Sequence, residues 1–275
     1  MQHVANLTLP AADPARHDAP HEETAIEIAN LSHVYEGAQG AVPALEDISM
    51  RVGSGRFVVI VGPSGCGKTS LLMMLAGLRA QSQGTITCHG IPIPSPDPKR
   101  VGVIFQEASL YPWLSALDNI EFPLSLRGAP RAERRQRAEA MLRLVGLEGF
   151  GGRYPHELSG GMKQRVSIAR GLVQDPPVLL MDEPFAALDE QTRMTMGHEL
   201  LRIWSTTSKT VVFITHSLTE AVYLADEVLV MSERPGRIID RIAVPLPRPR
   251  TYEMMATDVF GQLRERIWHQ IRKTP

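Results

Sequence analysis

The stretch RFVVIVGPSGCGKTSLL, residues 56–72, decides the fold of this protein. Its first part is an uninterrupted apolar run, which is typical of a strand buried on both faces of a parallel sheet. A glycine-rich turn follows the run, and residues 68–78 then have the composition of a helix. A strand, a glycine turn and a helix in this order predict an α/β protein with a parallel sheet at its core.

The glycine turn also predicts a ligand. Gly62, Gly67, Lys68 and Thr69 fit the pattern G-x-x-x-x-G-K-[ST], which lets backbone N–H groups surround a phosphate chain at a helix N-terminus. We expect Lys68 to reach the β- and γ-phosphates and Thr69 to offer its hydroxyl to Mg²⁺. The whole turn is assigned to nucleotide binding: Gly62, Pro63, Ser64, Gly65, Cys66, Gly67, Lys68, Thr69 and Ser70.

Cys66 lies inside this turn and allows two interpretations. The first is a small packing residue, which we favour. The second is a reactive thiol, because a helix N-terminus can lower the pKa of a cysteine.

Composition excludes several classes of protein. The chain has 275 residues, of which 43% are hydrophobic and 21% charged, and a formal net charge of −1, so we expect no nucleic-acid partner. Its two cysteines, Cys66 and Cys88, make no disulfide framework and suit a reducing compartment. The longest apolar stretches are far below the ~18 residues that a membrane span requires. We therefore expect a cytoplasmic globular protein.

The remaining sequence suggests how the chain is divided. Residues 1–25 have the composition of a disordered N-terminal tail. Residues 26–246 read as the core, with an inserted α-helical subdomain at about 107–177, and residues 247–275 as a C-terminal helical extension. We also predict a hairpin around Pro235 and Gly236. One helix of the insertion, residues 131–147, places these apolar residues on a single face: Ala138, Met141, Leu142 and Val145.

Polar side chains follow further apolar strands. VLLMDEP ends in Asp182 and Glu183, and two carboxylates there are costly unless they meet a cation or take part in chemistry. Asp182 is suited to hold Mg²⁺ and Glu183 to orient and deprotonate an attacking water. The alternative is a pair of solvated acids in a turn, which the phosphate loop makes less attractive.

His216 ends the apolar run TVVFITH, and Gln106 ends RVGVIF. A lone histidine after a strand is more often structural than catalytic. If the strands are neighbours in a parallel sheet, however, His216 reaches a γ-phosphate and Gln106 reaches metal or water, because the carboxyl ends of such strands form one active centre.

A second glycine turn, LSGGMKQR at residues 158–165, precedes another helical segment and also suits an anion. With this turn included, the sequence resembles the ATP-binding-cassette (ABC) ATPases over about residues 26–246. The matching residues are Tyr35, GPSGCGKT at 62–69, Gln106, LSGGMKQR at 158–165, VLLMDEP at 178–184, ALD at 187–189 and His216. The resemblance implies a P-loop NTPase fold: a RecA-like parallel sheet core, an antiparallel β-subdomain and an inserted α-helical subdomain.

The resemblance also implies roles for single residues. Tyr35 is similar to the aromatic residue that stacks on adenine, with an ordinary strand tyrosine as the alternative. Gln106 matches the glutamine that couples nucleotide to the helical subdomain, and His216 the switch histidine. The residues implied to face ATP bound to a partner subunit are Ser159, Gly160, Gly161 and Asp189. ATP and Mg²⁺ are the implied ligands, bound in a homodimer.

The match to the family has small departures. Met162 stands where a glutamine often follows the double glycine, which puts side-chain contacts at that position in doubt. The order after Lys68 is Thr69-Ser70, whereas many members have Ser-Thr. Both residues carry hydroxyls, so the metal role passes to Thr69.

Two further segments, residues 110–124 and 231–250, resemble the ATPases of nitrate, sulfonate, taurine and related small-anion importers. Such a protein acts at the cytoplasmic face of the inner membrane, where hydrolysis drives a separate permease supplied by an extracytoplasmic solute-binding protein. The region after Gln106, including Pro112, Trp113 and Leu114, is implied to receive the permease, with simple packing as the alternative. The rival functions are a soluble ABC-type ATPase acting on DNA or ribosomes, and a binding module without catalysis.

Overall fold

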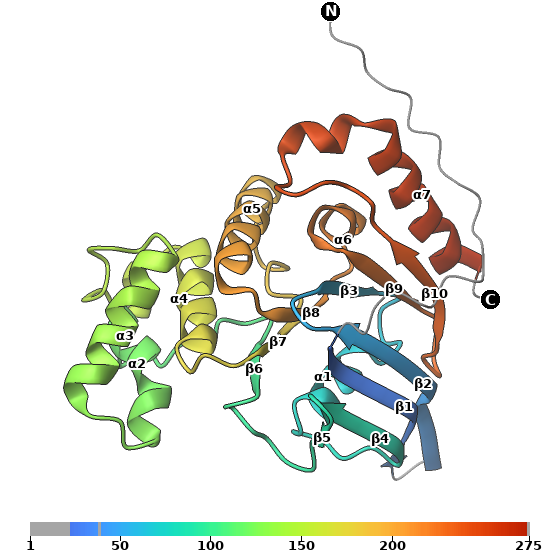
Figure 1. Ribbon diagram of the computed structural model, residues 1–275, viewed down its shortest axis with the longest axis horizontal. Coiled ribbons are helices and arrows are strands. Elements are labelled where there is room, and N and C mark those ends of the chain that lie inside the picture. The colour runs from blue at the N-terminus through green and yellow to red at the C-terminus, as the bar shows by residue number, and fades with distance from the viewer. Residues whose placement is uncertain (1–22, 38–39, 274–275) are drawn as a thin grey trace, which may run out of the picture.

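The computed structural model describes residues 23–37 and 40–273. It confirms the predicted fold class: a mostly parallel central sheet, a smaller antiparallel sheet, and helices that cover the central sheet and extend to one side (Figure 1). The helical and strand segments seen here fall in the order that the sequence predicts. The bounds assigned to the ATPase domain and its subdomains remain a prediction.

The central sheet has the strand order β10-β9-β3-β8-β7-β6. Strands β9, β3, β8, β7 and β6 run parallel, and β10 pairs with β9 in antiparallel fashion. The bounds are β3 Phe57–Val61, β6 Val101–Ile104, β7 Val178–Asp182, β8 Thr210–Ile214, β9 Glu227–Met231 and β10 Ile238–Ala243. The antiparallel β9–β10 pair confirms the hairpin predicted around Pro235 and Gly236.

Alternate side chains of the central sheet belong to different cores. Val59 of β3 packs in a cluster with residues of the helices that follow β6, whereas Val58 and Ile60 pack in a second cluster with residues of β1, β2 and α1. Every residue of β3, β7 and β8 is buried. An apolar run without alternation is therefore explained by burial on both faces of the sheet.

The antiparallel sheet has the strand order β2-β1-β4-β5. Its bounds are β1 Thr24–Gly37, β2 Gly40–Gly53, β4 Gln83–Cys88 and β5 Ile91–Pro92. Strand β1 begins at Thr24, which pairs with Gly53 of β2, and the Ala25 carbonyl accepts the His89 amide. Thr24 and Ala25 therefore belong to the sheet and not to the predicted tail, and the Glu23 carbonyl before them accepts the Ser54 amide. The rest of that prediction, residues 1–22, lies outside the described residues.

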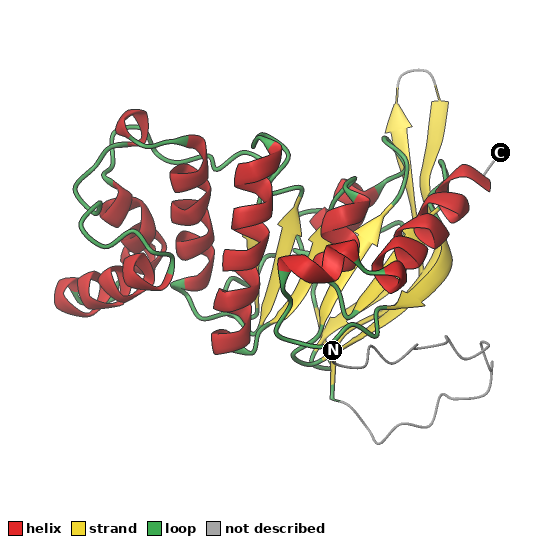
Figure 2. Ribbon diagram, turned by 90° about the horizontal axis from the view of Figure 1, so that it is seen from above, coloured by secondary structure: helices red, strands yellow, loops and turns green. Residues whose placement is uncertain are grey.

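The connection between β6 and β7 is helical. It contains α2 Ala116–Leu126, α3 Arg131–Leu144, the short 3₁₀ helix η1 Pro155–Glu157 and α4 Gly160–Leu172. Figure 2 shows these helices gathered at one end of the molecule, away from most of the strands. The apolar helix face predicted for residues 131–147 packs into the core, since Ala138, Leu142 and Val145 are buried and Met141 packs against the same cluster.

The other helices lie along the central sheet (Figure 1). They are α1 Lys68–Leu75, α5 Glu190–Thr207, α6 Leu218–Leu224, η2 Tyr252–Ala256 and α7 Asp258–Lys273. Helix α7 packs against the rest through the buried side chains of Phe260, Leu263 and Ile267. Among the described residues, no helix is both long enough and apolar enough to cross a membrane.

Candidate functional site

The sheet order brings four predicted segments to one edge. Strands β3, β8, β7 and β6 are consecutive neighbours and parallel, so their carboxyl ends meet. The phosphate loop follows β3, His216 follows β8, the Asp182–Glu183 pair ends β7, and Gln106 follows β6. The prediction that the strand before His216 neighbours the strand before Asp182 is confirmed.

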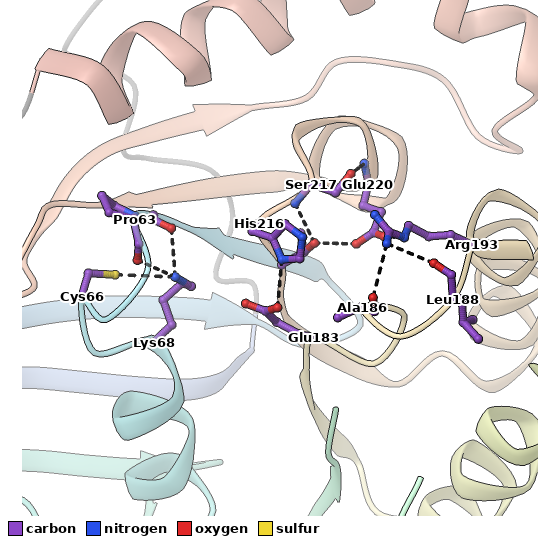
Figure 3. Close-up of polar contacts among 12 residues, drawn as sticks. Pro63, Cys66, Lys68, Glu183, Ala186, Leu188, Arg193, His216, Ser217 and Glu220 are labelled. Atoms are coloured by element: carbon purple, nitrogen blue, oxygen red, sulfur yellow. Dashed lines mark hydrogen bonds and ion pairs between the residues drawn. The ribbon is translucent and has the colours of Figure 1, made fainter. Parts of the chain in front are cut away.

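Lys68 is folded back onto its own loop. Its side chain is 7% exposed, and Nζ donates to the carbonyl oxygens of Gly62 at 2.9 Å and Pro63 at 2.8 Å. Figure 3 shows the ammonium inside the curve of the loop, with the sulfur of Cys66 also close to it. These are bonds that a phosphate chain entering the loop would compete with, since an ammonium binds anionic oxygens more strongly than neutral carbonyls.

Two glycines give the loop its shape. Gly67 has φ +106°, a value that side-chain-bearing residues rarely adopt, and a Cβ there would lie 2.7 Å from Leu45 Cδ2. A Cβ on Gly62 would lie 2.9 Å from the carbonyl oxygen of Met231 on the neighbouring strand. Both positions therefore require glycine for reasons of backbone geometry and close packing.

Cys66 is a packing residue. Its side chain is 1% exposed, and burial raises the pKa of the thiol despite the opposing effect of Lys68. The alternative that the helix N-terminus lowers this pKa is wrong, because desolvation of a thiolate outweighs the nearby charge.

Asp182 has the features of a cation ligand. It is 7% exposed, the nearby Thr69 hydroxyl favours its charged form, and its Oδ1 atom is buried without a hydrogen-bond partner. Burial raises the pKa of this carboxyl, and the charge of Glu183 adds to that effect. A desolvated carboxylate with an unused oxygen beside a hydroxyl is a suitable donor set for Mg²⁺.

No group of three or more His, Cys, Asp or Glu side chains suited to a metal occurs in the part of the chain that the structure describes. A metal beside Asp182 would thus take its other ligands from hydroxyl or amide oxygens, from water and from the nucleotide itself. Gln106 is exposed just after β6, and its amide oxygen is one such candidate ligand. Mg²⁺ commonly binds in this way, through few protein ligands together with substrate phosphates.

Glu183 and His216 form a close pair. Glu183 Oε2 lies 2.9 Å from His216 Nδ1 (Figure 3), and the Glu183 amide donates to the carbonyl of Ile214 at 2.9 Å. Glu183 has φ +45°, a left-handed conformation that costs energy in a residue with a side chain. The turn therefore directs a carboxylate toward the histidine, and this carboxylate is able to accept a proton from water.

Sequence reasoning missed a group of side chains behind this pair. Thr215 Oγ1 donates to Glu220 Oε2, and Glu220 Oε1 lies 3.4 Å from Arg193 Nε. Ser217, Leu218, Thr219 and Glu220 match the S-x-x-E capping pattern, which would have identified the start of α6. That pattern would have assigned the Glu220 side chain to capping, whereas it is bonded to Thr215 instead.

Tyr35 lies close to the phosphate-loop helix. Its hydroxyl is 2.8 Å from Ser70 Oγ, and the Arg79 guanidinium lies 4.8 Å from the centroid of its ring. Tyr35 is half-buried, and the His33 ring lies 4.7 Å from its ring, measured between centroids. The position is consistent with either of the roles that the sequence suggested.

The second glycine turn is at the surface. Ser159 caps α4 by accepting a hydrogen bond from the Met162 amide at 3.3 Å, so the departure at Met162 leaves this cap intact. Ser159 and Gly160 are exposed. Helix α4, which they begin, packs against α2, α3 and β6, whereas α1, the helix of the phosphate loop, packs against β7. A cavity of about 420 Å³ beside the turn is lined by Ser159, Gly161 and residues of α5, and by no residue of the phosphate loop.

Comparison with known proteins identifies the family. A sequence profile described as "ABC transporter" matches residues 45–186. The chain belongs to this family. The taurine import ATP-binding protein TauB of Pseudomonas putida is 49% identical over 217 residues, which cover 79% of this chain and 82% of that protein. An uncharacterised ABC transporter ATP-binding protein of Methanocaldococcus jannaschii is 48% identical over 225 residues, 82% of this chain and 84% of the relative.

A solved structure agrees with this assignment. The dimeric post-hydrolysis state of the ATP-binding cassette MJ0796, bound to ADP and Pi, has a TM-score of 0.71 and 31% sequence identity, and the match covers 81% of this chain and all of that one. As a member of the ABC transporter family with a complete phosphate loop, the chain is an ATP hydrolase. ATP is the nucleotide that ABC ATPases bind in general.

An aromatic patch follows Gln106 in this ABC ATPase. Trp113 is 71% exposed, and the Tyr111 ring lies 5.7 Å from Trp113 and 4.6 Å from Phe122, measured between centroids. The Arg170 guanidinium of α4 donates to the carbonyl oxygens of Ala108 and Ser109, which ties this segment to the helix of the second glycine turn. Pro112 is also exposed, whereas Leu110 packs against the core and Leu114 is half-buried.

Proposed function

We propose that this protein is the ATP-hydrolysing subunit of an ABC importer. MgATP binding closes a head-to-tail dimer, and hydrolysis reopens it to drive a separate permease. The observation that carries this proposal is the exposed turn at Ser159 and Gly160, which suits an anion and lies beside a cavity that contains no residue of the phosphate loop of its own chain. Such a turn is useful if it meets the nucleotide of a second copy.

Hydrolysis depends on Glu183 and His216, which lie at the carboxyl ends of β7 and β8. Glu183 accepts the proton of the attacking water, and His216, 2.9 Å from Glu183, holds this carboxylate in place and faces the γ-phosphate. Lys68 leaves the carbonyls of Gly62 and Pro63 to bind the β- and γ-phosphates. Thr69, Gln106 and Asp182 would hold Mg²⁺, which neutralises charge on the phosphates.

The dimer supplies the remaining donors. Ser159 and the amides of Gly160 and Gly161 approach the γ-phosphate held by the partner, and Asp189 lies beside the same interface. The similar cassette MJ0796 is described as a dimer, which supports this arrangement. Two-fold symmetry makes both sites complete at once, because each subunit contributes the same two surfaces.

The permease binds at the patch of Pro112, Trp113 and Leu114. An exposed tryptophan beside exposed proline is typical of the centre of a protein interface. The TauB relatives, named for taurine import, support a small organic or inorganic anion such as taurine, a sulfonate or nitrate as the imported solute. In this role the subunit sits peripherally at the cytoplasmic face of the inner membrane, and a solute-binding protein acts indirectly through the permease.

Glu183→Gln tests the proposed function. The variant keeps the size of the side chain but removes the base, so we expect normal ATP affinity, hydrolysis slowed by about 10²–10⁴-fold, and accumulation of an ATP-bound dimer. ATPase assays and size-exclusion chromatography with ATP measure these outcomes. Glu148→Gln, at an exposed position outside the site, is the control.

Rapid hydrolysis by Glu183→Gln would overturn the assignment of the base. A strictly monomeric variant in saturating MgATP would overturn the dimer. Copurification of the wild type with ribosomes or DNA, and with no permease, would favour a soluble ABC-type ATPase over an importer subunit.

A further inference from the structure

The turn that carries His216 and the loop that carries Asp189 are joined twice. The first link is the Glu183–His216 contact, which belongs to the hydrolytic site. The second runs through Thr215, Glu220 and Arg193, the last two of which are labelled in Figure 3. The reaction as described above uses only the first link.

The second link begins at β8. Thr215, 2% exposed, donates its hydroxyl to Glu220 Oε2 and accepts the Ser217 amide at 2.9 Å. Glu220 lies in the first turn of α6 and is one of the described carboxyls whose pKa is raised by burial. The hydrogen bond from Thr215 fixes the position of the Glu220 carboxylate relative to His216, because His216 is adjacent to Thr215 in the chain.

The link continues to α5. Arg193 lies in the first turn of α5, with its Nε atom 3.4 Å from Glu220 Oε1. Its Nη2 donates to the carbonyl oxygens of Leu188 at 3.1 Å and Ala186 at 3.5 Å. These carbonyls belong to the loop between β7 and α5, which ends at Asp189. One guanidinium therefore holds both the carboxylate of the His216 turn and the backbone of the Asp189 loop.

Both side chains of this pair are largely shielded from water, Arg193 being 18% and Glu220 12% exposed. Arg193 Nε makes no hydrogen bond, so the pair attracts across 3.4 Å by charge rather than through a directed bond. Because both side chains are partly buried, water screens this attraction little, and the distance of 3.4 Å leaves room for it to shorten when the two segments move.

We propose that Arg193 and Glu220 are a positioning pair that makes the Asp189 loop and the His216 turn move together. Because Asp189 lies beside the partner in the proposed dimer, closing the dimer then sets His216 and Glu183 for hydrolysis. This inference rests on the proposed function. It assigns to residues outside the ATP site the coupling between assembly and catalysis.

Substitution of each member tests the pair. Arg193→Met removes the contacts of the guanidinium with Glu220 and with the loop carbonyls, together with its 3.8 Å ion pair with the exposed Glu190. Glu220→Gln keeps the acceptor for Thr215 but removes the charge. We expect each to lower kcat at least tenfold, with KM and the ATP affinity of the monomer changed less than twofold, because neither residue lies in the phosphate loop. In a double-mutant cycle the effects on kcat should be far from additive, since one contact is lost in all variants.

A conservative variant separates positioning from stability. Arg193→Lys keeps a charge opposite Glu220 but cannot also reach the two loop carbonyls, so we expect it to restore the unfolding temperature and not kcat. In a Glu183→Gln background, Arg193→Met should also weaken the ATP-dependent dimer. Arg202→Met is the matched control, because Arg202 on the same helix pairs with Glu199 at 3.0 Å and donates to the Leu144 carbonyl.

The outcomes distinguish this inference from the proposed function. If the Glu183→Gln parent forms no ATP-dependent dimer, the proposed function fails. If the parent dimerises but Arg193→Met and Glu220→Gln hydrolyse ATP like the wild type, the positioning pair is refuted. Recovery of kcat by Arg193→Lys, or additive losses in the cycle, would refute it as well. Should Arg193→Met fail to fold, the nearly isosteric Glu220→Gln and Arg193→Lys decide the question.

Discussion

At the residue scale, Lys68 shows how a charged side chain is stabilised by its own loop when no ligand is bound. In this structure its ammonium is satisfied by the loop carbonyls of Gly62 and Pro63, so the buried charge is not left without partners. The same carbonyls hold the side chain pointing into the loop. Little conformational entropy therefore remains to be lost when a phosphate replaces them.

Replacing this ammonium should weaken nucleotide binding. Hydrogen bonds to charged groups contribute about 1.5–3 kcal/mol, so Lys68→Ala should lose roughly 10–100-fold in ATP affinity. Equilibrium titration with a fluorescent ATP analogue measures the loss. Lys99→Ala, at an exposed position away from the loop, serves as the control, and equal affinities for the two variants would contradict the assignment.

At the element scale, two helices begin with capping residues at the surface proposed to face the partner. Ser159 accepts the Met162 amide at the start of α4, and Asp189 accepts the Thr192 amide at 3.0 Å at the start of α5. The caps leave other first-turn amides available, which is the property that makes a helix N-terminus an anion site. Local helix geometry thus suits both elements to the proposed contact with the nucleotide of a partner subunit.

Ser159→Ala should separate binding from turnover. Loss of the cap costs about 1 kcal/mol of stability, and loss of one donor to a phosphate slows hydrolysis roughly 10–100-fold. The ATP affinity of the monomer should not change, because the phosphate loop is intact. Ser115→Ala removes the equivalent cap of α2, which accepts the Asp118 amide at 3.1 Å, and should keep full activity. A Ser159→Ala protein with normal turnover would exclude contact with nucleotide.

Asp189 gives a pH-dependent prediction. The hydrogen bond from the Thr192 amide lowers the pKa of Asp189 from its ordinary value of 3.8, so the folded state favours the charged form. Its stabilising effect is therefore complete above about pH 5 and is lost as the pH falls through the lowered pKa. Asp189→Ala should be less stable than the wild type at pH 7, and the two unfolding curves should converge in acid. A stability difference that persists unchanged below that pKa would contradict the cap.

At the scale of the whole molecule, the helical region connects two distant surfaces. Arg170 of α4 holds the backbone of Ala108 and Ser109, next to the exposed Trp113, while the other end of α4 begins at Ser159. Helix α4 therefore has a proposed nucleotide contact at its start and a proposed permease contact near Arg170. A rigid helix between two such contacts is suited to transmit movement from one to the other.

Trp113→Ala should uncouple the subunit from its permease. Truncating a central interface tryptophan typically costs 2 kcal/mol or more, which corresponds to roughly 30-fold weaker binding. The soluble ATPase activity should stay at its wild-type value. Copurification with a membrane permease, compared with Trp268→Ala on α7, measures the effect. Equal recovery of the permease with both variants would place the contact elsewhere.

The amino-acid sequence by itself determined the fold class, the phosphate loop and the segments that end at the edge of the sheet. These features depend on local rules, because a strand buried on both faces needs a continuous apolar run and a phosphate loop needs glycines next to a helix. The β9–β10 hairpin was predictable for the same reason. The sequence also indicated that the turn at Ser159 and Gly160 suits an anion, although the chain already has a separate phosphate loop.

Only the tertiary structure decided the direction in which the pKa of Cys66 is shifted, and only it revealed the contact between Glu220 and Arg193. Burial raises the pKa of Cys66, and burial depends on packing against strands far away in the chain. The Arg193–Glu220 pair joins helices α5 and α6, which are brought together because β7 and β8 are neighbours in the sheet. A contact between residues so far apart in sequence has no local pattern, and its existence follows only from the order of the strands.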